Sequence, residues 1–191
     1  MNDIQSELLK IIPEDTPNPN SNKFNVNRIL LQGAGRDFTT VESALSSPLA
    51  KELFLINGVK GIFIGSNFVT VSVESGKDWW ALRPVIAQSI ESFILSGQSV
   101  VQGADEKAAA LTPGLFSPVE LGIQRVLQDE IQPAVAMDGG HISFVSFENG
   151  IVRVQLRGAC HSCPSSIVTL KMGIENRLKQ EFPEVTTVEA V

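Results

Sequence analysis

The chain has 191 residues, 43% hydrophobic and 19% charged, which is an ordinary composition for a soluble globular protein and a length that suits two small domains. The formal net charge of −6 and the lack of clustered Lys and Arg argue against a nucleic-acid-binding surface. The most apolar stretch, residues 53–73, is interrupted by Asn57, Lys60, Gly61 and Asn67 well short of a membrane helix. Neither nucleic acid nor a membrane is therefore an expected partner.

The chain begins with a predicted N-terminal extension, residues 1–13. The extension carries Asp3 and Glu7 and has no long apolar run, so it resembles neither a secretory signal nor an Arg-rich transit peptide. Two closely spaced cysteines do not form the multi-bridge framework of a small secreted domain, which favours a reducing compartment. We expect the bacterial cytoplasm, or the mitochondrial matrix if the source is eukaryotic and a transit peptide has been removed.

Residues 14–96 form the first predicted domain, with an expected order of two strands, a helix, two strands and a helix. Its recognisable elements are a strand within residues 24–31, a helix within "SPLAKELFLI", a hairpin over 58–73 and a helix within "DWWALRPVIAQSIESFI". The sequence "GAGRDF" at 33–38 lacks the third Gly of a dinucleotide-binding fingerprint, so it is predicted to be a loop. A flexible linker, residues 97–116, follows because periodicity gives way to Gly, Ser, Gln and Ala.

Residues 117–191 form the second predicted domain. Ser117, Pro118 and Glu120 predict a capped helix that ends at Pro133. The remaining elements are a turn at residues 138–140, a hairpin over 141–158 with its tight turn at Asn149 and Gly150, a helix from Pro164 and a strand within 185–191. The predicted fold class is α+β, with two small α/β-sandwich-type domains joined by the flexible linker.

The only two cysteines, Cys160 and Cys163, lie where a predicted strand leads into a helix. Unpaired N–H groups and the helix dipole favour anions at such a helix start, so we expect lowered thiol pKa values and available thiolates. A disulfide, a redox-active dithiol and a metal site all remain open from this placement.

The number of thiols favours a shared metal site. A cubane iron–sulfur cluster usually takes four cysteine thiolates, and each chain supplies two. Two chains about a two-fold axis supply four, which predicts a cluster bridged between subunits and near the surface. A cluster held in this way can be released by ligand exchange, as in a carrier protein.

The second domain closely resembles the NifU C-terminal CxxC domain, and the first resembles the Nfu N-terminal domain. The motifs that carry this resemblance are "MDGGHISFV", "VQLRGACHSCPSSIVTLKMGIENRL" and "PEVTTVEAV" in the second, and "TPNPNSNKF", "SPLAKELFLINGVKGIFIG" and "FVTVS" in the first. The resemblance implies an iron–sulfur cluster scaffold or carrier that binds a [4Fe–4S] cluster across a homodimer. It implies Cys160 and Cys163 as the cluster and metal ligands, and apo iron–sulfur clients and upstream assembly proteins as partners.

Other residues near the cysteines enter no ligand set. His161 and His141 are predicted not to be ligands, and residues 138–140 are predicted to form a turn that could also shape the cysteine loop. Arg157 and Lys171 are expected on solvated faces.

No catalytic residue is assigned and the protein is not expected to be an enzyme, because no Ser/His/Asp set or paired carboxylate site stands out. The alternatives are a thioredoxin-like thiol-disulfide oxidoreductase and a zinc-bridged dimer.

Overall fold

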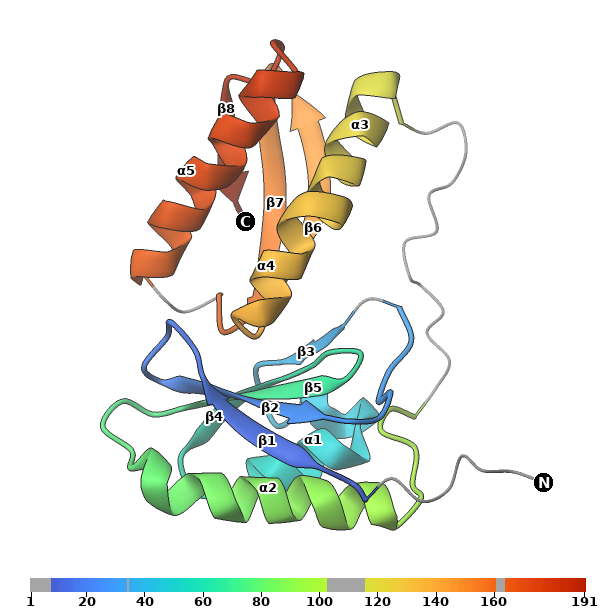
Figure 1. Ribbon diagram of the computed structural model, residues 1–191, viewed down its shortest axis with the longest axis vertical. Helices are drawn as coiled ribbons and strands as arrows, with labels where there is room; N and C mark the ends of the chain where they lie inside the picture. The colour runs from blue at the N-terminus through green and yellow to red at the C-terminus, as the bar shows by residue number, and fades with distance from the viewer. Residues whose placement is uncertain (1–7, 34, 103–115, 161–163) are drawn as a thin grey trace, which may run out of the picture. The chain divides into compact units, whose positions relative to one another are not determined.

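The computed structural model describes residues 8–33, 35–102, 116–160 and 164–191, and these form two compact units (Figure 1). The first unit is built on a five-stranded sheet and the second on a three-stranded sheet, each with helices packed on one face. This arrangement confirms the predicted α+β class. None of the helices in the described part of the chain combines the length and the apolarity needed to traverse a bilayer. The predicted domain boundaries remain predictions, and most of the predicted linker lies outside the described residues.

The sheet of the first unit is antiparallel, in the order β1-β2-β5-β4-β3. Its strands are β1 (Ile11–Asp15), β2 (Ser21–Val26), β3 (Arg36–Phe38), β4 (Val59–Ile64) and β5 (Phe68–Val73). A 3₁₀ turn, η1 (Ser43–Ser46), precedes α1 (Pro48–Phe54), and α2 (Trp79–Leu95) follows the sheet. Alternate residues of β2, β4 and β5 meet these helices in a core centred on Phe24, Ile62, Val69, Ile86 and Ile90.

Residues 11–15 form the edge strand β1, in which Pro13 is tolerated because an edge strand needs no N–H on its open side. Two predictions for the first unit are corrected. The segment predicted to be a loop at 33–38 contains β3, a three-residue edge strand held by β4. The strand expected within 24–31 is β2, which begins at Ser21 and ends at Val26.

The beginning of the predicted linker packs against the first unit. Ser47 caps α1 by accepting a hydrogen bond from the Ala50 N–H (3.1 Å), and its hydroxyl donates to the Val100 carbonyl (2.7 Å). The Gln102 N–H donates to the Ser46 carbonyl at 2.7 Å. These bonds fix residues 100–102 on the start of α1, so flexibility is not expected for this part of the predicted linker.

The sheet of the second unit has the order β6-β7-β8, with β6 and β7 antiparallel and β8 parallel to β7. Its elements are α3 (Pro118–Val126), the π-helical η2 (Leu127–Ile131), α4 (Gln132–Met137), β6 (Gly140–Glu148), β7 (Ile151–Gly158), α5 (Pro164–Glu181) and β8 (Thr187–Ala190). The helices lie on one face of the sheet (Figure 1). Their shared core is centred on Ile123, Val152, Ile174, Leu178 and Val188.

Two local predictions for this unit are confirmed. Ser117 and Glu120 form the predicted capping box at the start of α3, with bonds of 3.3 Å to the Glu120 N–H and 2.7 Å from the Ser117 N–H. Asn149 (φ 51°) and Gly150 (φ 78°) form the tight turn between β6 and β7. Both residues tolerate the positive φ that such a hairpin turn requires.

The prediction that the first helix ends at Pro133 is wrong. The helix continues through the π-helical turn η2 into α4, where Pro133 lies in the first turn. The Gln132 N–H bonds to the Leu127 carbonyl, five residues back, which widens the helix just before the proline. The wider turn gives the proline ring room and makes its missing N–H harmless.

Glu175 joins α5 to β8. Its carboxylate accepts hydrogen bonds from the Lys179 ammonium (2.5 Å), the Thr187 hydroxyl (2.9 Å) and the Val188 N–H (3.0 Å). The bond from Lys179, then those from Val188 and Thr187, lower the pKa of Glu175 to about 2. Because the folded-state pKa lies below the unfolded value, the ionised carboxylate stabilises the fold above that value, and the stabilisation is lost as pH falls toward 2.

Glu175→Gln is expected to lower the free energy of unfolding of the second unit by about 1–2 kcal/mol at pH 7, after allowance for solvent screening at this partly exposed position. The difference from wild type should shrink between about pH 5 and pH 2, because protonation removes the same charge from the wild-type side chain. Urea unfolding at several pH values measures it. Glu184→Gln, which changes an exposed carboxylate in the same unit, is the control. A wild-type-to-variant difference that stays constant from pH 7 to pH 3 would contradict the prediction.

Candidate functional site

Cys160 lies two residues after the end of β7, and α5 begins four residues later at Pro164. Its side chain is buried, with the residue 4% exposed, and it joins the apolar core of the second unit. The predicted strand-to-helix placement of Cys160 is therefore confirmed. The other predicted ligand, Cys163, and the neighbouring His161 lie outside the described residues.

The backbone turn at residues 138–140 holds the chain that leads to Cys160. The N–H groups of Asp138 and Gly139 bond to the carbonyls of Ala134 (3.2 Å) and Ala136 (3.1 Å), which ends α4. Gly139 then adopts a φ of 77°, and its carbonyl accepts the Ala159 N–H at 3.2 Å. The residue before Cys160 is therefore tied to the end of α4.

Gly140 forms the surface on which Cys160 packs. A Cβ at Gly140 would lie 2.6 Å from the Cys160 Sγ and 3.0 Å from the Arg157 carbonyl oxygen. Gly140 is paired across the sheet with Gly158, whose φ of 67° turns the chain out of β7. Only a residue without a side chain lets the thiol approach this backbone so closely.

The first strand of the hairpin is fixed at the same end. The Gln132 carboxamide oxygen accepts a hydrogen bond from the Ile142 N–H at 2.9 Å, which joins the start of α4 to β6. The sequence offered no signal for this bond. The Asp-Gly-Gly motif did signal a turn, and the structure adds that its last glycine contacts the cysteine.

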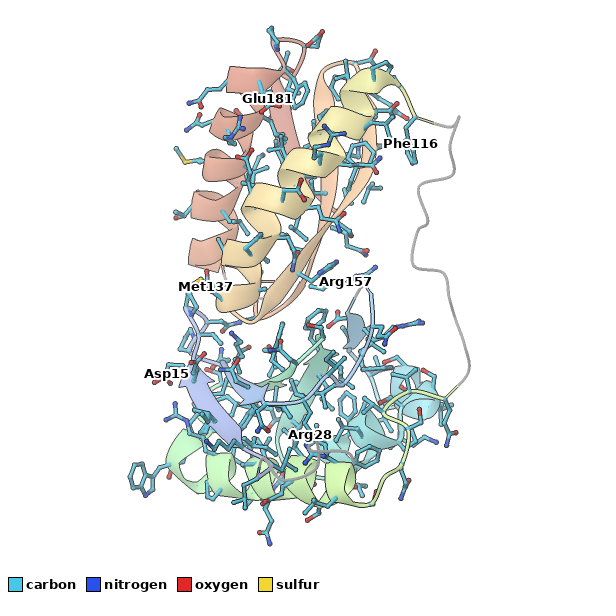
Figure 2. The ribbon with its side chains drawn as sticks, turned by 45° about the vertical axis from the view of Figure 1, so that its right-hand side comes forward. Asp15, Arg28, Phe116, Met137, Arg157 and Glu181 are labelled. Carbon is cyan, nitrogen blue, oxygen red and sulfur yellow. The ribbon has the colours of Figure 1, made fainter. Side chains whose placement is uncertain are left out.

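Two basic side chains flank this end of the hairpin. His141 and Arg157 are cross-strand neighbours. Burial, and secondarily the charge of Arg157, lowers the pKa of His141 from its ordinary value. The Arg157 guanidinium donates to the Gln155 carboxamide oxygen at 2.6 Å. Figure 2 shows Arg157 and Met137 at one end of the second unit, and Phe116 and Glu181 at the other.

A multidentate metal site is not assembled from the described residues alone. Among residues 8–33, 35–102, 116–160 and 164–191, no group of three or more His, Cys, Asp or Glu side chains is placed to hold a metal ion. Cys160 is the predicted ligand that the described structure places.

Two family models match the chain. Residues 11–97 match the model "Scaffold protein Nfu/NifU N terminal", and residues 123–189 match the model "NifU-like domain". The chain belongs to the Nfu/NifU-like family. Cys160, Gly140 and the turn that joins them all lie within the NifU-like domain.

Curated relatives of this Nfu/NifU-like chain include two fly proteins named "NFU1 iron-sulfur cluster scaffold homolog, mitochondrial". The protein of Drosophila willistoni is 41% identical and that of Drosophila erecta 42% identical, each over 179 residues, or 93% of this chain. The chain spans 62% and 63% of their respective lengths. Family membership favours the cluster-scaffold interpretation over the oxidoreductase alternative.

A solved structure also aligns with the chain. The solution NMR structure of a NifU-like protein from Saccharomyces cerevisiae covers 53% of this chain and 92% of its own, with a TM-score of 0.46 and 24% sequence identity.

Proposed function

We propose that this protein is an iron–sulfur cluster carrier that binds a [4Fe–4S] cluster between two copies of the chain and transfers it to apo-proteins. The observation that carries the proposal is the position of Cys160, at a strand-to-helix junction in a NifU-like domain, with the only other cysteine three residues further on. The cluster is the cargo of the protein, held by Cys160 and Cys163 from each copy.

The donor set supports this proposal. Thiolates are the ligands that hold a cubane cluster, and four are needed where one chain offers two. A two-fold contact between identical chains supplies the other two. Cys160 packs closely on the Gly140 backbone, so the fold would hold this ligand in a fixed position.

The proposal extends to the location and the clients of the whole protein. The relatives' names describe cluster scaffolds and a mitochondrial location, which favours the mitochondrial matrix and apo iron–sulfur proteins as clients. The second domain, residues 117–191, would hold the cluster. Delivery by ligand exchange requires no catalytic residue, so we assign a carrier role and no enzymatic step.

Anaerobic reconstitution with ferric iron, sulfide and a thiol reductant tests the function. We expect a broad visible absorption, one [4Fe–4S] cluster per two chains and a dimeric mass by light scattering. Transfer is then measured as the appearance of cluster in a purified apo-ferredoxin. Colourless zinc binding without iron uptake would instead support a zinc-bridged dimer. Catalytic reduction of disulfide substrates without iron would support an oxidoreductase.

A further inference from the structure

The first half of α5 presents an uncharged face to solvent. Val168 and Met172 are 59% and 60% exposed, and Thr169 and Gly173 are exposed beside them. These positions recur at a spacing of four residues, so they lie on one side of the helix. The opposite side carries Ile174, which is buried in the core. Two large apolar side chains are therefore left uncovered on this face.

Gly173 has no packing role among the described residues. Apart from its own helix backbone, none of their atoms lies within 4 Å of the position that a Cβ would take. Glycine inside a helix is destabilising relative to alanine. A helix glycine on an exposed face lets the backbone of another element approach closely. The glycine thus suits a contact made from outside the chain.

Two charged side chains that follow this face along α5 make ion pairs within the chain. Glu175 bonds to Lys179 and to β8. Arg177 donates to Glu130 at 2.6 and 2.7 Å and to Glu181 at 2.6 Å. A two-fold contact brings each residue close to its own copy, so a face with charges of one sign would repel itself. The uncharged face of α5 carries no such penalty.

The position of the face indicates its partner. If two copies share one cluster, the two-fold axis passes beside both cysteine loops. Helix α5 begins four residues after Cys160, and at about 1.5 Å per residue Val168 and Met172 lie only about 6 and 12 Å along it from Pro164. Figure 1 shows this end of α5 at the same end of the unit as the end of α4, which hydrogen bonds tie to Ala159.

We propose that the face formed by Val168, Thr169, Met172 and Gly173 packs against the same face of a second copy in the cluster-bridged dimer. This inference rests on the proposed function and adds the protein surface that joins the two copies. The contact buries apolar side chains beside the cluster, which stabilises the dimer in addition to the cluster bonds.

Charge substitutions in the full-length chain test this contact. Met172→Glu and Met172→Lys, each reconstituted with iron and sulfide, are expected to raise the dimer dissociation constant at least tenfold, because each places like charges at the two-fold axis. The use of both signs separates repulsion between copies from any effect of charge on the anionic cluster. An equimolar mixture of the two variants should recover the dimer, since opposite charges then meet. Leu121→Glu and Leu121→Lys, on the partly exposed side of α3, are the matched controls.

Light scattering, iron content and visible absorption are measured on each sample. The inference is supported if the wild-type protein forms a dimer with one cluster, both Met172 variants weaken that dimer, and their mixture restores it. Unchanged dimerisation in both variants overturns the inference and leaves the proposed function intact. If those variants also transfer the cluster to apo-ferredoxin more slowly, the face binds a client instead of a second copy. A wild-type protein that takes up no cluster overturns the proposed function and this inference together.

Discussion

Replacement of Cys160 is expected to abolish cluster binding. Cys160→Ser removes one of two thiolates per chain, so the dimer retains two of the four ligands that a cubane cluster needs. Iron content after anaerobic reconstitution should fall from about two atoms per chain to less than about a tenth of that value. The visible absorption and the cluster-dependent dimer should be lost with it.

Cys160→Ala separates ligand loss from damage to the fold. Cys160 lies in the apolar core, where a serine hydroxyl must be desolvated, whereas alanine adds no polar group. Both variants should lose the cluster, and the alanine variant should retain more of the wild-type free energy of unfolding. Wild-type iron content in a folded Cys160→Ala protein would exclude Cys160 as a ligand.

Gly140→Ala is expected to displace Cys160 and reduce cluster occupancy. The new Cβ would lie 2.6 Å from the Cys160 Sγ, 3.0 Å from the Arg157 carbonyl oxygen and 3.2 Å from the Cys160 Cβ. Such overpacking typically costs about 1–3 kcal/mol, and relief requires either the thiol or the β6–β7 hairpin to move. Iron content and urea unfolding measure the two effects.

A double-mutant cycle assigns the clash to the thiol. Gly140→Ala should cost less unfolding free energy in a Cys160→Ala background, because the contact with Sγ is gone. Gly61→Ala in β4 is the control, since its Cβ would have no neighbour closer than 3.7 Å. Equal costs in the two backgrounds would show that the clash comes from the Arg157 carbonyl oxygen and the Cβ of residue 160 and not from the thiol.

Local signals in the sequence predicted local structure well. The capping box at Ser117 and the turn at Asn149 and Gly150 depend on residues within a few positions of one another, and both occur as predicted. The alternation of Val152, Val154 and Leu156 likewise predicted the buried face of β7. Such features can be predicted because their hydrogen bonds and side-chain directions are set within the segment itself.

Features that depend on a distant partner were predicted poorly. The edge strands β1 and β3 exist because β2 and β4 supply their hydrogen bonds, and neither segment has a strong strand pattern of its own. The helix continues past Pro133 because a π-helical turn, which no residue type marks, makes room for the proline ring.

The sequence by itself determined the family resemblance, the α+β class and the number of thiols, from which a cluster shared by two copies is inferred. Only the tertiary structure decided that Cys160 packs on the Gly140 backbone and that Val168 and Met172 remain exposed on α5. The difference has a physical reason. Ligand type and number are properties of single residues, whereas a close approach between Gly140 and Cys160, 20 positions apart, exists only once β6 and β7 have paired.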